Sequence, residues 1–147
     1  MKPQGLFFII VGIVGMIVSI LLMLDSLSAP SYCLVRSSCT TVTQSEYAYL
    51  FGIPLWFLAL IGFTSYTILG ALYTILKNVN VTYILLLVIF IGSIASSILA
   101  LYLINIELNI LHTVCSYCSI LHLLIFSSSA YTTYLLYNFH HVLKEEI

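Results

Sequence analysis

Four long apolar stretches limit what this sequence can fold into. The first, Leu6–Leu24, contains nineteen residues without a charged side chain. As a helix that rises about 1.5 Å per residue, it reaches roughly 28 Å, the thickness of the hydrocarbon core of a bilayer. Further stretches begin near Tyr49, Val81 and Val114, and each is long enough to cross with some tilt. We therefore predict an all-α integral membrane protein, a bundle of four transmembrane helices.

The composition agrees with a chain surrounded by lipid. Hydrophobic residues make up 62% of the 147 residues and charged residues 6%, against roughly 45–50% and 25% in soluble domains. The formal net charge of −1 leaves no basic surface for nucleic acid phosphates. We expect one membrane domain over residues 1–147, with an outer loop at about 28–47. The expected helices lie at about 6–27, 49–76, 81–106 and 114–138.

The few basic residues predict how the chain is oriented, because lysine and arginine remain on the cytoplasmic side more often than not. Lys2, Lys77 and Lys144 share one side if the chain crosses four times, and only Arg36 lies opposite. We therefore expect both termini in the cytoplasm. The long loop after the first helix and the turn at Glu107 would then face outward.

Small side chains spaced four residues apart predict where helices pack closely, because lipid supplies no hydrophobic drive between helices. The pairs with this spacing are Gly15 with Ser19, Gly92 with Ser96, and Ser93 with Ser97. We expect these residues to line helix contacts and assign them no chemistry. The apolar stretches carry no acidic residue well inside them, which disfavours a small transporter.

Four cysteines are candidates for chemistry. Cys33 and Cys39 lie in the predicted outer loop, and Cys115 and Cys118 form Cys-Ser-Tyr-Cys at the start of the fourth helix. An outer compartment allows disulfides to persist, so a structural membrane protein with two static disulfides is one interpretation. Four cysteine ligands for zinc are another, but the spacing of the first pair exceeds the usual two to four residues. We predict no metal site.

The Cys-x-x-Cys pair favours redox chemistry over static disulfides. At a helix start, the sulfur of Cys115 lies beside unsatisfied N–H groups and the positive end of the helix dipole, which stabilise the thiolate that attacks disulfides. His112, if charged, would lower the pKa of this thiol further. Cys118 lies one turn deeper, where an oxidant dissolved in lipid reaches it. The pattern predicts a relay for electrons.

Further residues extend this pattern. In order they are Cys33-x5-Cys39, Ser45, Tyr47-Ala48-x-x-Phe51-Gly52-Ile53-Pro54 and Cys115-Ser-Tyr-Cys118. Together they resemble the vitamin K epoxide reductase family, particularly its bacterial and archaeal members. In the quinone-linked oxidases of the DsbB type, the two cysteine pairs occur in the reverse order. The resemblance covers essentially the whole chain and suggests a stand-alone homologue without a fused thioredoxin-like domain.

The resemblance implies a quinone-dependent thiol–disulfide oxidoreductase that supports disulfide bond formation. Cys115 and Cys118 would form its redox centre, and Cys33 and Cys39 its shuttle pair. A separate thioredoxin-like (DsbA-like) protein would supply electrons, and ubiquinone, menaquinone or a related quinone would take them from Cys118. The resemblance places the protein in the cytoplasmic membrane of a bacterium or archaeon, with its cysteines on the outer side.

Two more residues are candidates for the quinone site, together with Cys118. Ser45 matches a serine that the family places near the quinone, although serine is equally suited to cap a helix. His122 follows Cys118 by one turn on the same helical face, where the vertebrate enzyme of the family has a tyrosine. An ionisable residue inside the membrane indicates function, here as a donor to a quinone carbonyl, while a hydrogen bond between helices is the alternative.

Overall fold

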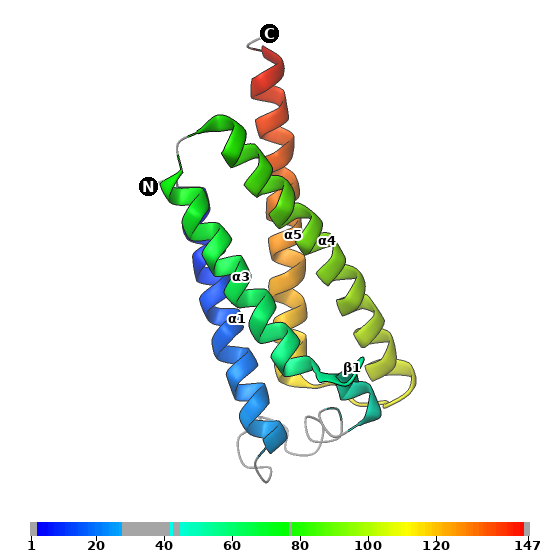
Figure 1. Ribbon diagram of the computed structural model, residues 1–147. Helices are drawn as coiled ribbons and strands as arrows, with labels where there is room; N and C mark the ends of the chain where they lie inside the picture. The colour runs from blue at the N-terminus through cyan, green and yellow to red at the C-terminus, as the bar shows by residue number, and fades with distance from the viewer. Residues whose placement is uncertain (1–2, 28–41, 43–44, 77, 146–147) are drawn as a thin grey trace.

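A computed structural model describes residues 3–27, 42, 45–76 and 78–145, and side chains up to residue 138. Its elements are helices α1 (Pro3–Leu27), α3 (Leu55–Ile75), α4 (Val79–Asn109) and α5 (Ser116–Glu145), a short 3-10 helix η1 (Glu46–Ala48), and strands β1 (Tyr49–Leu50) and β2 (Ile53–Pro54). The four α-helices run lengthwise in one bundle (Figure 1). Each is long and apolar enough to cross a membrane, which confirms the predicted four-helix membrane bundle.

Several predictions concern residues outside this description. Cys33 and Cys39, the predicted shuttle pair, are among them. So are Lys2, Arg36 and Lys77, and the side chain of Lys144, whose charges predicted the orientation. The shuttle pair and the orientation therefore stay predictions.

The helices associate mainly as two pairs. α1 packs along α3, and α4 packs along α5, while α1 also touches α5. α3 and α4 follow each other in the chain but make few contacts, and α4 leans away from α3 toward the end of the bundle that carries β1 (Figure 1). The space between α3 and α4, in front of α5, contains a cavity that residues of all three helices line.

Small residues draw α1 and α3 together, as the sequence predicted for Gly15 and Ser19. Gly15 lies against the ring of Phe63. Ser19 is 1% exposed, and its hydroxyl donates to the Gly15 carbonyl at 2.7 Å. On α3, Gly70 lies so close to Phe8 that an added Cβ would be 2.7 Å from the Phe8 Cβ.

The small residues of α4 divide into two roles. Ser93 and Ser97 contact α5, where the Ser129 hydroxyl donates to the Ser93 carbonyl at 3.0 Å and shares a 2.7 Å hydrogen bond with the Ser97 hydroxyl. Gly92 differs from the prediction, because a Cβ there would meet no atom within 4 Å. Gly92 and Ser96 line a cavity and not a helix contact.

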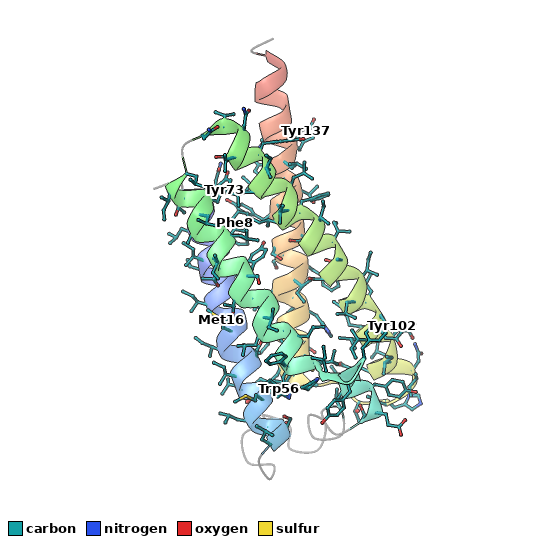
Figure 2. All side chains as sticks on the ribbon, in the orientation of Figure 1. Phe8, Met16, Trp56, Tyr73, Tyr102 and Tyr137 are labelled. Carbon is teal, nitrogen blue, oxygen red and sulfur yellow. The ribbon has the colours of Figure 1, made fainter. Side chains whose placement is uncertain are left out.

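Large apolar side chains lie both in the interior of the bundle and on its outer faces, as expected for a protein in lipid. Phe8 is fully buried between the helices, whereas Tyr102 and Tyr137 project outward and are more than half exposed (Figure 2). Many leucine and isoleucine side chains are exposed along the outer faces of the four helices. These faces contact hydrocarbon, so their exposure carries no hydrophobic penalty.

The second transmembrane helix begins later than the sequence predicted. A helix was expected from Tyr49, but α3 begins at Leu55, because β1, β2 and the turn between them occupy the intervening residues. Pro54 has no N–H to donate, and its ring disfavours helical backbone at Ile53. Gly52 has a φ of 81°, which glycine adopts without strain. The hairpin therefore replaces the first turns of the expected helix.

The third helix is longer than predicted, and this changes the position of Glu107. The expected end was residue 106, but α4 continues to Asn109, so Glu107 belongs to the helix and not to an outward turn. The helix then closes with a turn in which the Thr113 N–H donates to the Glu107 carbonyl at 3.1 Å, and His112 has a φ of 49°. The following helix, α5, begins at Ser116 and extends past the expected residue 138.

Candidate active site at Cys115 and Cys118

Cys115 caps the N-terminus of α5 with its own sulfur. Its carbonyl accepts the Ser119 N–H at 2.9 Å, which is the first hydrogen bond of the helix. Its Sγ accepts the N–H of Cys118 at 3.4 Å. This is the geometry by which serine or aspartate caps a helix, with sulfur in place of oxygen. The Cys-x-x-Cys spacing therefore places the first sulfur on a helix N–H that would otherwise lack a partner.

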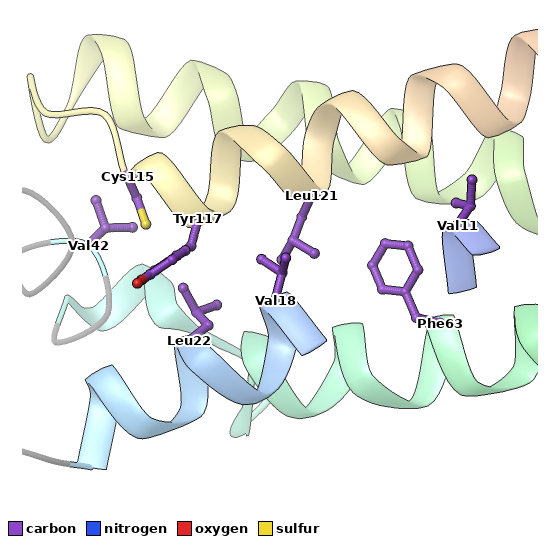
Figure 3. Packing of buried hydrophobic residues seen from close by; sticks show 8 residues of the cluster. All are labelled: Val11, Val18, Leu22, Val42, Phe63, Cys115, Tyr117 and Leu121. Carbon is purple, nitrogen blue, oxygen red and sulfur yellow. The ribbon is translucent and has the colours of Figure 1, made fainter. Parts of the chain in front are cut away.

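Hydrophobic side chains enclose Cys115. The residue is 0% exposed and lies in a buried cluster with Val42, Leu22 and Tyr117. Figure 3 shows its sulfur directed toward Val42 and the Tyr117 ring. Cys118, by contrast, is partly exposed. In this structure Val42 and Tyr117 therefore pack against the Cys115 sulfur.

Hydrogen bonds to sulfur lower the pKa of Cys115 below the ordinary thiol value of 9.0. The largest contribution is a hydrogen bond from the Cys118 thiol, and the backbone N–H groups of Cys118 and Tyr117 add to it. Burial and the negative charge of Glu107 act in the opposite direction. Cys115 is therefore the thiol of the pair that ionises first. His112 is exposed and does not contribute to this shift, contrary to the possibility raised by its position in the sequence.

Glu107 is a site residue that the sequence did not indicate. It is 5% exposed at the end of α4, and its carboxylate accepts hydrogen bonds from the backbone N–H of Cys115 and from the Cys118 thiol. A signal was available, since a carboxylate at the edge of an apolar helix is costly in lipid. Because the helix was predicted to end at residue 106, Glu107 was assigned to a solvated turn, where a carboxylate does not indicate a functional site.

An apolar cavity of about 370 Å³ lies in the opening between α3, α4 and α5. Its polar lining near the thiols consists of Glu107, Cys118, His122 and Ser45. A second cavity of about 320 Å³ lies at the end of the bundle, where Val42 and Trp56 line it. Cys118 lines both cavities. One sulfur thus borders the cavity between the helices and also the cavity beside Val42 and Trp56.

Ser45 and His122, the two predicted quinone contacts, both line the larger cavity. Ser45 stands at the N-cap position of η1 but makes no capping hydrogen bond. Its hydroxyl donates instead to the carbonyl of Val42 at 2.8 Å. His122 is 7% exposed and lies one turn beyond Cys118 on α5. The structure therefore brings Ser45, Cys118 and His122 to one cavity, together with the unpredicted Glu107.

Polar groups also occur at the far end of this cavity, where the sequence suggested only helix contacts. The buried Tyr66 hydroxyl of α3 lies beside the side chains of Ser93, Ser128 and Thr132. These three hydroxyls donate to backbone carbonyls of their own helices. These hydroxyls add polar atoms beside the cavity without placing a charge there.

The four spanning helices and the thiol pair at one end define a multi-pass integral membrane protein with a dithiol site. In a comparison with protein families, the model of the Vitamin K epoxide reductase family matches residues 6–133 of this chain. The chain belongs to this family and is a membrane thiol–disulfide oxidoreductase, which confirms the resemblance. The family is associated in general with quinones and with thioredoxin-like partners. A comparison with curated proteins finds no match.

Proposed function

We propose that this protein oxidises a thioredoxin-like protein outside the cytoplasm and passes the electrons to a membrane quinone. The single observation that carries the proposal is the position of Cys118, which lines the apolar cavity inside the bundle and also the cavity at its end. A sulfur in that position is accessible from the lipid side and contacts Cys115, which ionises first. Static disulfides would not require such a cavity.

Electrons enter the chain through the outer loop. The partner dithiol reduces the Cys33–Cys39 disulfide, and the Cys39 thiolate then attacks Cys115 in a Cys115–Cys118 disulfide. The bond between Cys115 and Cys118 breaks, and Cys118 leaves as a thiolate. Cys33 next attacks Cys39, which restores the shuttle disulfide and releases Cys115. Two electrons have then moved from the partner to the Cys115/Cys118 pair.

The cavity suits a quinone in size and in lining. Its walls are mostly apolar, as a quinone ring and its isoprenoid tail require, and its few polar groups lie together near Cys118. His122 would donate to a quinone carbonyl, and Ser45, whose own proton goes to Val42, would accept from a reduced quinone hydroxyl. A bound quinone supplies an acceptor for two electrons and two protons.

Burial of Cys115 limits which thiols react with it. Val42 belongs to the same outer segment as Ser45 and covers the Cys115 sulfur. A shift of this segment would expose Cys115 to Cys39 and would at the same time change the wall of both cavities, which Val42 also lines. Access of the shuttle pair would thereby be coupled to the state of the quinone site.

The membrane orientation follows from the predicted chemistry and the charge bias together. Both termini lie in the cytoplasm, and the cysteines lie on the outer side, in the cytoplasmic membrane of a bacterium or archaeon. Thiol labelling of intact cells with a membrane-impermeant maleimide tests this placement. Labelling of all four cysteines only after the cytoplasm is opened would reverse it.

The decisive experiment measures quinone reduction by the purified protein with a reduced thioredoxin-like donor. Cys118→Ala is expected to abolish quinone reduction and to accumulate a disulfide between Cys39 and Cys115. Cys39→Ala is expected to block electron entry from the protein donor while a small dithiol still reduces the redox centre. Glu46→Gln, an exposed position on η1, is the matched control and should reduce quinone at the wild-type rate.

A static scaffold predicts a different pattern. In that case Cys118→Ala would lower thermal stability without any change in a redox rate, because no such rate would exist in the wild type. Wild-type quinone reduction by the Cys118→Ala variant would refute the assignment of Cys118 as the electron exit.

A further inference from the structure

The thiol of Cys118 has two hydrogen-bond acceptors and only one proton. One acceptor is the sulfur of Cys115 and the other is the Glu107 carboxylate. The carboxylate also accepts the backbone N–H of Cys115, so it is held against the pair from the end of α4. Reaction at the pair therefore takes place within hydrogen-bonding reach of Glu107.

Glu107 is buried beside the thiol pair. Only 5% of the residue is exposed. The other titratable groups that line its cavity are Cys118 and His122 on α5, Tyr66 on α3 and Tyr47 in η1, and Cys115 lies at the start of α5. No lysine or arginine side chain is among the residues whose side chains are described. A buried carboxylate with no cationic partner among the described side chains is costly, and such groups are typical of sites where protons are handled.

The thiol chemistry requires a proton acceptor at this position. Formation of the Cys115–Cys118 disulfide removes two electrons and two protons from the pair. Cys115 ionises readily, but the Cys118 proton must leave into an apolar cavity, where few groups can accept it. Among the described residues that line the cavity, Glu107 is the only carboxylate.

We propose that Glu107 is the proton-transfer residue of the redox centre. When the pair is oxidised, two electrons pass to the membrane quinone, the Cys118 thiol gives its proton to the Glu107 carboxylate, and the S–S bond forms with the Cys115 thiolate, which has already lost its proton. When the pair is reduced, an attacking thiolate breaks that bond at Cys115, and Cys118 leaves with its electron pair and takes a proton from the Glu107 carboxyl group. The second proton leaves Cys115 when its thiol ionises before oxidation, and on reduction Cys115 takes it from the second thiol of the attacking dithiol.

This role rests on the proposed thiol chemistry but not on the identity of the electron acceptor, so it can be tested without a quinone. The assay uses the chain with Cys33→Ala and Cys39→Ala, in which Cys115 and Cys118 are the remaining cysteines. The pair is oxidised, and its reduction by dithiothreitol is followed by quenched alkylation with a maleimide that shifts the protein on a gel. Rates are measured across a range of pH.

Glu107→Gln keeps the size of the side chain and its acceptor for the Cys115 N–H, but it cannot transfer a proton. We expect roughly a hundredfold slower reduction, at the lower end of general acid–base contributions of about 10²–10⁴. The ionisation of Glu107 should also disappear from the pH profile. Glu107→Asp should recover part of the rate, and Glu46→Gln should behave as the wild type.

If the Glu107 carboxylate acted only as a fixed charge, the Glu107→Gln substitution would change the reduction rate in the opposite direction. Removal of its negative charge would favour the approach of an anionic thiolate, so Glu107→Gln would be reduced faster and would keep the wild-type shape of the pH profile. A rate equal to or above the wild type overturns the proposal.

A second measurement uses the unmutated carboxyl group, in case the glutamine variant does not fold. The infrared difference spectrum between the disulfide and dithiol forms should contain a carboxylic acid C=O band, and its absence overturns the proposal. Failure of the proposed function appears elsewhere, as absence of quinone reduction in the wild type. The two outcomes can therefore be told apart.

Discussion

Substitutions at two glycines, Gly70 on α3 and Gly92 on α4, test which helix surfaces are in close contact and which line the cavity. At Gly70 on α3, an added Cβ would lie 2.7 Å from the Phe8 Cβ and 3.3 Å from the Ile9 nitrogen. Neither atom is the end of a flexible side chain, so α1 and α3 would have to separate. At Gly92 on α4, an added Cβ would meet nothing within 4 Å.

These distances give opposite expectations for the same chemical change. Gly70→Ala should lower the free energy of unfolding by about 1–3 kcal/mol, the usual cost of overpacking. Gly92→Ala should leave it unchanged or raise it by up to about 1 kcal/mol, because alanine is a better helix former than glycine. Gly92→Leu should fill part of the cavity of about 370 Å³ and raise the KM for quinone.

The assay combines stability and binding on the same preparations. Unfolding in mixed micelles with increasing dodecyl sulfate, followed by circular dichroism, measures the free energy of unfolding. Quinone titration of the reduction rate measures KM. Gly70→Ala is then expected to change stability but not the KM of the folded protein, and Gly92→Leu to change KM but not stability.

Two results would refute this reasoning. A Gly70→Ala variant as stable as the wild type would show that α1 and α3 are not in close contact at this position. A Gly92→Leu variant with the wild-type KM would show that the cavity is not where the quinone binds.

Three further predictions concern single residues. Because the pKa of Cys115 is lower in the folded protein than in the unfolded chain, its ionisation stabilises the fold fully at pH above the unfolded pKa, and this stabilisation is lost as pH falls through the folded pKa. In a protein with Cys33→Ala and Cys39→Ala, adding Cys118→Ala should raise the pKa of Cys115, measured by the ultraviolet absorbance of its thiolate. His122→Leu should weaken quinone binding roughly 2- to 10-fold, the loss of one hydrogen bond of about 0.5–1.5 kcal/mol, and an unchanged KM would remove His122 from the site. Ser129→Ala should lower the free energy of unfolding by about 0.6 kcal/mol for each of its two hydrogen bonds, to the Ser93 carbonyl and to the Ser97 hydroxyl, as measured by the same unfolding assay. No change would show that these hydrogen bonds do not hold α4 to α5.

The membrane class and the location of the thiol chemistry could be predicted from local features of the sequence. Uncharged stretches long enough to span a bilayer require helices, since backbone groups in lipid can be satisfied only within the segment. Cys-x-x-Cys at the start of a helix places the first sulfur on helix N–H groups, and Cys115 indeed accepts the N–H of Cys118. Both properties depend on residues a few positions apart, so they do not require knowledge of the packing.

The tertiary structure decided which residues join that pair. Glu107 contacts Cys118 because α4 continues beyond residue 106 and returns through the turn at His112, and hydrophobicity alone does not fix where a helix ends. Gly92 faces a cavity and not a helix because α3 and α4 diverge, although its spacing equals that of closely packed pairs. A spacing of residues defines the face of a helix, whereas the angle between helices determines whether that face meets a neighbour or an open space.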